Sequence, residues 1–101
     1  MAAFRFSRLA ESDLLEIAEY TLRTWGAEQT LRYLEDIETC CRMLADHPLL
    51  GMPSNSIRPG LRRMECGRHV VFFREDAGGI LVSRILHQRM LPARHIMDDD
   101  E

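Results

Sequence analysis

Arginine and histidine side chains gather in the last forty or so residues of the chain, and their chemistry suits a phosphodiester. Four of them stand out: Arg63, Arg84, His87 and Arg89. A guanidinium can stabilise the oxygens of a phosphorane, and histidine has an ordinary pKa that suits proton transfer near neutral pH. Cleavage of RNA by an adjacent 2′-hydroxyl needs both. The same cations could instead pair with carboxylates of a protein partner, so residue type alone leaves both functions open.

Metal and cofactor chemistry find no support in the sequence. The histidines are His47, His69, His87 and His95, and no two of them have a compact ligand spacing with a third partner. We therefore predict neither a metal site nor a cofactor.

The three cysteines are Cys40, Cys41 and Cys66. An odd number does not make a disulfide framework, and neighbours on a helix point to different sides of it. We predict that all three are reduced and structural.

Charge is divided sharply along the chain. Residues 1–50 contain nine acids and five arginines, whereas residues 51–97 contain three acids and eight arginines. The last four residues, 98–101, are all acidic, and every basic residue of the chain is arginine. The positive half favours an acidic partner or nucleic acid, although a solvated mixed-charge surface would explain it equally well.

Local signals predict a strand and two helices in the first half. Residues 4–6 form a short strand, and Ser7 is suited to cap the helix that follows. Gly26 ends that helix, and a second helix runs from there to Pro48, which bars continuation. The turn is so short that the helices must be antiparallel. The expected apolar faces are Leu14, Ile17, Ala18, Thr21, Leu22 and Trp25 on the first helix, and Leu31, Leu34, Ile37, Cys41 and Leu44 on the second.

The second half predicts three consecutive antiparallel strands. Residues 48–60 read as a loop rich in glycine and proline, and the strands follow at 61–66, 69–75 and 80–87. Short turns between them place Cys66 opposite His69, and Glu75 opposite Ile80. The expected fold is α+β, with the N-terminal strand, the helical hairpin and then the three-stranded meander.

Strict alternation along these strands predicts an exposed apolar patch. One face collects Arg62, Met64, Cys66, His69, Val71, Phe73, Val82, Arg84 and Leu86, and we expect the helices to cover it. The opposite face then leaves Val70, Phe72, Leu81 and Ile85 exposed among arginines. Such a patch, rimmed by charge, usually marks a partner site.

Five segments in this order resemble the RelE/ParE superfamily of toxin–antitoxin toxins, and within it the ParE branch. They are FRFSRLAESDLLEI, TLRTWGAEQTLRYL, LADHPLLG, IRPGLRRMECGRHVVFFRE and SRILHQRM. No single segment is specific, but together they span nearly the whole chain.

The resemblance implies a cytoplasmic toxin that stabilises the cleaved-DNA complex of DNA gyrase and has no catalytic residues. A ParD-like antitoxin would neutralise it in a heterotetramer or larger complex, with DNA reached only through the antitoxin or gyrase. The residues expected to bind the antitoxin are Arg63, Val70, Phe72, Arg74, Leu81, Ile85 and Arg89. Those expected to bind the target are His87, Arg89, Met90 and Arg94.

Two alternatives stay open beside gyrase inhibition. One is a ribosome-dependent mRNA endonuclease of the RelE branch, using Arg63, Arg84, His87 and Arg89; the absence of lysine and the net charge of −3 weigh against it. The other is an inactive module that only binds the antitoxin. In each case we expect a single domain over residues 1–97, an acidic disordered tail at 98–101 and no membrane segment.

Overall fold

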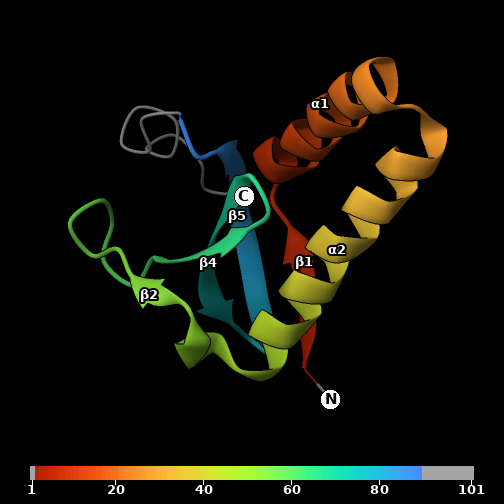
Figure 1. Cartoon of the computed structure of the whole chain (residues 1–101). Coiled ribbons are helices and arrows are strands. Elements are labelled where there is room, and N and C mark those ends of the chain that lie inside the picture. The colour runs from red at the N-terminus through yellow and green to blue at the C-terminus, as the bar shows by residue number, and fades with distance from the viewer. Residues whose placement is uncertain (1, 90–101) are drawn as a thin grey trace.

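A five-stranded sheet with a helical hairpin on one face makes up the fold (Figure 1). The computed structural model describes residues 2–89. The strand order is β1-β5-β4-β3-β2, with β1 parallel to β5 and the other pairs antiparallel. The elements are β1 (Ala3–Phe6), α1 (Arg8–Trp25), α2 (Ala27–Asp46), the 3-10 helix η1 (Pro48–Leu50), β2 (Met52–Pro53), β3 (Arg62–Cys66), β4 (His69–Asp76) and β5 (Gly79–His87).

The predicted α+β class and element order are confirmed. Ser7 caps α1 as expected, because its side chain accepts a hydrogen bond from the Ala10 N–H at 3.0 Å. Gly26 separates the helices with a positive φ of 91°. The structure adds η1 and β2 within the region predicted as loop. Within residues 2–89, neither helix is long and apolar enough to span a membrane.

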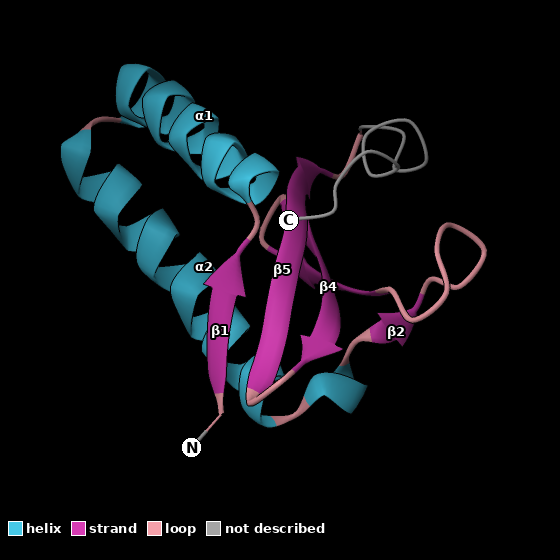
Figure 2. Cartoon of the chain, turned by 180° about the vertical axis from the view of Figure 1, so that it is seen from behind, coloured by secondary structure: helices cyan, strands magenta, loops and turns pink. Residues whose placement is uncertain are grey.

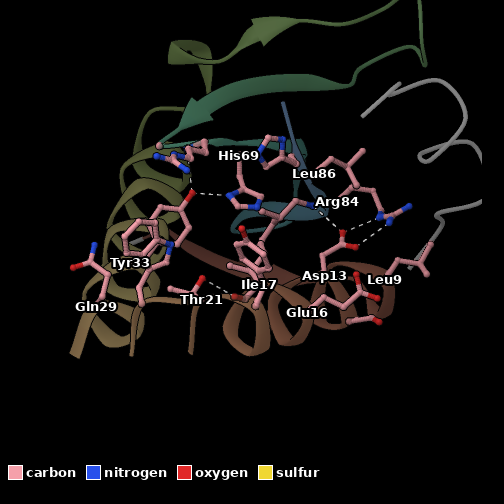
Figure 3. Close-up of a pocket in the computed structure, with 17 residues that line it drawn as sticks. Leu9, Asp13, Glu16, Ile17, Thr21, Gln29, Tyr33, His69, Arg84 and Leu86 are labelled. Atoms are coloured by element: carbon pink, nitrogen blue, oxygen red, sulfur yellow. Dashed lines mark hydrogen bonds and ion pairs between the residues drawn. The ribbon is translucent and has the colours of Figure 1, made fainter. Parts of the chain in front are cut away.

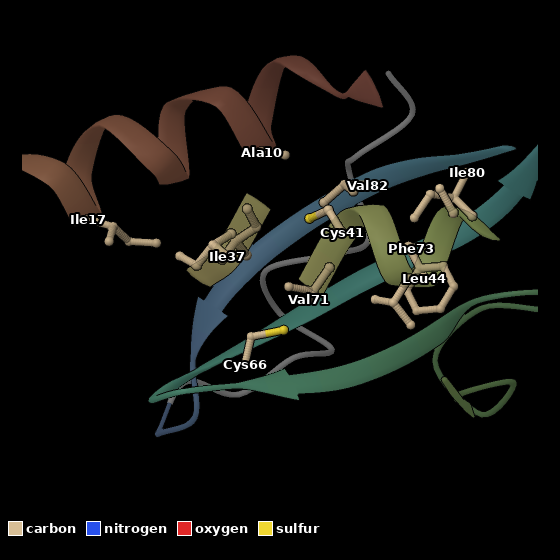
Figure 4. Close-up of a cluster of buried hydrophobic side chains, with 12 residues drawn as sticks. Ala10, Ile17, Ile37, Cys41, Leu44, Cys66, Val71, Phe73, Ile80 and Val82 are labelled. Carbon is tan, nitrogen blue, oxygen red and sulfur yellow. The ribbon is translucent and has the colours of Figure 1, made fainter. Parts of the chain in front are cut away.

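The main core lies between the helices and the sheet (Figure 4). Ile37, Cys41 and Leu44 of α2 pack there against Val71 and Phe73 of β4, and all five are at least 98% buried. A smaller cluster lies apart from this core, formed by Leu61, Phe72 and Leu86 with the partly buried Ile57 and Val70. The segment before β3 thus supplies two members, Ile57 and Leu61, that pack against Phe72.

The predicted exposed patch is wrong. Phe72 and Leu81 are each 1% exposed and Ile85 is 2% exposed, while Val70 is partly buried. The pairs Cys66–His69 and Glu75–Ile80 are confirmed. Two physical causes account for the burial of Phe72 and Ile85: the segment before β3 packs on Phe72, and a bulge changes the alternation along β5 beyond Val82.

The bulge lies midway along β5, where the pairing with β4 skips Ser83. Phe73 pairs with Val82, but Phe72 pairs with Arg84. An extra residue reverses the side-chain alternation beyond it. Ile85 therefore joins the core under the helices, and Leu86 joins the smaller cluster, the opposite of their predicted faces.

The prediction that all cysteines are reduced is also wrong. A disulfide joins Cys40 of α2 to Cys66 at the end of β3, with Cα atoms 6.6 Å apart. Cys41 is free and buried, and burial raises the pKa of its thiol to about 12. The pairing depends on how α2 crosses β3, which residue spacing does not reveal.

Trp25 is 59% exposed, although its position in the apolar stripe predicted a core residue. Leu22 and Leu31 are exposed too, at 53% and 65%. The cause is visible in Figure 2, where the joined ends of α1 and α2 extend beyond the sheet. Those ends have no sheet to pack against.

Side chains of α1 bind the backbone of β5 where β1 leaves it. Just after β1, the backbone N–H of Ser7 donates a hydrogen bond to the Val82 carbonyl of β5 at 2.9 Å. The Ser7 hydroxyl then donates to the Ser83 carbonyl at 2.7 Å. Asp13 continues the series: its Oδ2 accepts from the Ile85 N–H at 2.9 Å, and its two oxygens accept from Arg84 Nε and Nη2 at 2.8 and 2.9 Å. Both side chains of this ion pair are at least 88% buried.

We predict that Asp13→Asn lowers the free energy of unfolding by about 3 kcal/mol, because it leaves a buried guanidinium without its carboxylate. Urea denaturation followed by circular dichroism measures the change. The matched control is Glu38→Gln, which removes the exposed pair of Glu38 with Arg42 and should cost about 0.5 kcal/mol or less. Equal effects of the two substitutions would contradict the anchoring role of Asp13.

Candidate functional site

A groove of about 830 Å³ lies between α1 and the C-terminal half of β5 (Figure 3). We call it the α1–β5 groove. One side is α1 from Leu9 to Trp25, and the other is β5 from Arg84 to His87. Gln29 and Tyr33 of α2 and the turn residues Gly67, Arg68 and His69 close one end.

Apolar side chains make up much of this groove. Ile17 on α1 and Ile85 on β5 are buried, whereas Tyr20 and Trp25 are each 59% exposed. An exposed pair of aromatic residues beside an apolar surface is typical of a site that a partner covers.

The end of the groove near α2 contains a hydrogen-bonded cluster of Tyr33, Arg68, His69 and His87. The Tyr33 hydroxyl lies 2.6 Å from His69 Nδ1 and accepts from the Arg68 backbone N–H at 3.1 Å. The rings of His69 and His87 meet edge to face, with centroids 5.4 Å apart. A side chain on Gly67 would clash with Tyr33, since a Cβ there would lie 2.8 Å from its ring.

Burial governs the ionisation of this cluster. Desolvation, followed by the neighbouring His87, lowers the pKa of His69 to about 4, against a smaller opposing effect of Asp13. Desolvation also raises the pKa of Tyr33. At neutral pH the groove therefore presents an uncharged imidazole at His69 and a protonated phenol at Tyr33.

The structure divides the nuclease residues predicted from the sequence. Arg84 and His87 both line the groove, but the guanidinium of Arg84 is bound to Asp13. Arg63 is exposed on β3, outside the groove. In the strand pairing it lies opposite Phe72 of β4. Arg89 is exposed beyond β5, and its backbone N–H donates to His87 Nδ1 at 3.2 Å. The four residues do not form one catalytic centre.

The remaining predicted residues are placed as follows. Arg74 is partly buried on β4, next to Leu81 of β5 in the pairing. Met90 and Arg94, expected to bind the target, lie outside the described residues. Within the described part of the chain no three His, Cys, Asp or Glu side chains gather to hold a metal ion.

Among the groove residues that sequence reasoning missed are Tyr20, Tyr33, Arg68 and His69. Arg68 and His69 were assigned only to a turn and to a strand face. The turn residue Gly67 is the one local signal, because glycine permits close approach of another side chain. Nothing in the sequence shows that the approaching side chain is Tyr33.

Comparison with known proteins assigns the family. The profile described as "ParE toxin of type II toxin-antitoxin system, parDE" matches residues 4–92. The chain belongs to the ParE toxin family. The ParE resemblance predicted from the five segments is thereby confirmed.

Individual relatives agree with this assignment over most of their length. Toxin ParE1 of Caulobacter vibrioides is 38% identical over 96 residues, covering 95% of this chain and 99% of that protein. Toxin ParE of Escherichia coli is 40% identical over 93 residues, covering 89% and 88%. A solved structure titled "Chromosomal ParDE TA system from P. aeruginosa" matches with a TM-score of 0.72 and 25% identity, covering 86% of this chain and 96% of that one. The ParE toxin fold thus extends over this chain.

The low pKa of His69 predicts a pH dependence of stability. Because the folded-state pKa is depressed below the ordinary value of 6.5, the unfolded chain takes up this proton first. The His69 contribution to stability is therefore fully present above about pH 6.5 and is lost as the pH falls toward about 4. Urea denaturation should give the free energy of unfolding of the native protein and of His69→Gln at each pH. The difference between the two proteins should shrink as the pH falls over this range. A constant difference between them would contradict the depressed pKa.

Proposed function

We propose that this ParE-family toxin is neutralised by a ParD-type antitoxin whose apolar segment lies in the α1–β5 groove. We further propose that the free toxin inhibits DNA gyrase by stabilising its cleaved-DNA complex, without catalytic residues of its own. The observation that supports the first proposal best is the exposure of Tyr20 and Trp25 beside the apolar part of the groove.

The dimensions of the groove suit a polypeptide better than a small molecule. Its α1 side runs from Leu9 to Trp25, a distance of about 24 Å at the rise of a helix. A bound helix would need about four turns to cover that length, and an extended strand about seven residues. An amphipathic segment in an apolar groove is a common mode of peptide recognition.

The antitoxin contacts predicted from the sequence are revised accordingly. Phe72 and Leu81 are buried and lie outside the groove, so we no longer propose them as direct antitoxin contacts. Ile85 is buried as well, but it lines the groove and stays a proposed contact. Arg63 and Arg89 are exposed, and we retain them as charged contacts at the periphery of the interface. The anchors of the interface become Tyr20 and Trp25.

Inhibition of gyrase rests on family membership together with the separation of the cationic residues. A nuclease centre would need a guanidinium free to meet the phosphorane, whereas Arg84 is bound to Asp13 and Arg63 lies away from His87. His87 and Arg89, at the end of β5, remain our proposed contacts with the target. The proposed site of action is the cytoplasm.

We predict that Trp25→Ala weakens binding of the cognate ParD-type antitoxin by about 2 kcal/mol or more, as expected for an exposed aromatic anchor. Tyr20→Ala should weaken it similarly. Titration calorimetry measures the affinity. Leu49→Ala is the matched control, because Leu49 is 75% exposed but lies outside the groove. An unchanged affinity of both aromatic variants, in folded protein, would exclude the groove as the antitoxin site.

The target is tested with purified gyrase, ATP and plasmid. Antitoxin-free toxin should produce linear DNA in proportion to its concentration after denaturation and protease digestion. Adding the antitoxin should prevent it. Normal supercoiling without linear DNA would exclude gyrase inhibition; ribosome-programmed mRNA cleavage would then identify a nuclease, and its absence an inert antitoxin-binding module.

A further inference from the structure

His69 presents a donor to the groove because Tyr33 occupies its other ring nitrogen. The Tyr33 oxygen already accepts from the Arg68 N–H. Its proton has two possible acceptors, His69 Nδ1 at 2.6 Å and the Cys66 carbonyl at 3.5 Å. A separation of 2.6 Å is typical of a hydroxyl donor, and 3.5 Å is too long for a strong bond. Tyr33 therefore donates to Nδ1, and neutral His69 carries its proton on Nε2.

His87 is held in the same tautomer by a different contact. Its Nδ1 accepts the backbone N–H of Arg89 at 3.2 Å. A neutral imidazole has one acceptor and one donor nitrogen, so the proton of His87 is on Nε2. Two imidazoles in ring contact thus each have a donor nitrogen that neither backbone nor Tyr33 engages.

Other titratable and charged groups near this pair belong to α1, α2 and the turn before β4. Asp13 of α1 accepts from Arg84 and from the Ile85 N–H, so its oxygens are already bonded. Glu16 also lines the groove from α1, and Figure 3 shows it beside Asp13 and Leu9 and not beside Tyr33. Tyr33 of α2 donates its single hydroxyl proton to His69, and Arg68 of the turn also lines this end. An incoming group here therefore meets the Nε2 donors of the two histidines and the positive charge of Arg68.

We propose that His69, His87 and Arg68 form a subsite for a carboxylate of the antitoxin segment in the α1–β5 groove. The inference rests on the proposed function. A carboxylate accepts several hydrogen bonds and complements a site that offers only donors. A nucleic-acid phosphate fits less well, because apolar walls and the acids Asp13 and Glu16 line the same groove. The subsite would fix the register of the segment, while Tyr20 and Trp25 supply contact area.

A bound carboxylate also links binding to pH. An opposite charge beside an imidazole raises its pKa, so formation of the complex should be accompanied by proton uptake. Because His69 of the free toxin has a pKa of about 4, the affinity of the antitoxin should increase as the pH is lowered from neutral toward that value.

The tautomers can be read directly from the free toxin. Long-range proton–nitrogen NMR of the neutral rings should show His69 and His87 each protonated on Nε2. Protonation of either ring on Nδ1 would overturn the donor arrangement, whatever the toxin acts on.

Affinity measurements with the cognate antitoxin test the subsite itself. His87→Leu should weaken binding at least about tenfold, the effect of losing a hydrogen bond to a charged group. His87→Gln keeps a donor, so it should bind more tightly than His87→Leu. His47→Gln is the matched control, because His47 lies at the end of α2 outside the groove, and it should leave affinity and pH dependence unchanged.

The partner group is identified by changing each acid of the antitoxin segment to its amide. One such change, or amidation of the antitoxin C-terminus, should abolish the difference between native toxin and His87→Leu. The inference is overturned if no amide change does so, or if both His87 variants bind like the native protein. Complete failure of the native toxin to bind the antitoxin would instead refute the proposed function.

Discussion

The whole arrangement depends on how β5 satisfies its backbone after β1 turns away. A strand in the interior of a fold cannot leave its N–H and C=O groups without partners. Here α1 supplies them: Ser7 donates to the Ser83 carbonyl, and Asp13 accepts from the Ile85 N–H. Arg84 neutralises the buried carboxylate that does this. The first turns of α1 thus act as a continuation of the sheet, and they fix the distance between α1 and β5 that defines the groove.

The bulge at Ser83 is the second feature that determines how β5 meets its neighbours. It moves Ile85 into the core beneath the helices. It also places His87 opposite His69. Without the extra residue, strict alternation would put Ile85 on the opposite face and Leu86 under the helices. The local interruption in the pairing of β4 with β5 thus accompanies the formation of the α1–β5 groove.

A groove built in this way suits recognition more than catalysis. Its walls are a helix and a strand with a buried ion pair at their junction, so its shape is fixed before a partner arrives. Its aromatic residues are exposed because the helical hairpin extends past the sheet. Its polar end holds two imidazoles whose ring nitrogens are oriented by neighbouring groups. Such preorganisation reduces the entropy lost when a partner binds.

The sequence by itself determined what depends on local stereochemistry. Ser7, Gly26 and Pro48 marked the helix boundaries, and the turns at Gly67 and before Ile80 set the register at both ends of the meander. Five ordered segments were enough to indicate the family. Contacts between distant residues were decided only by the tertiary structure: the Asp13–Arg84 pair, the Cys40–Cys66 disulfide and the Tyr33–His69 contact. Each depends on where a helix crosses a strand, and a single bulged residue reverses every side chain beyond it, which periodicity alone cannot reveal.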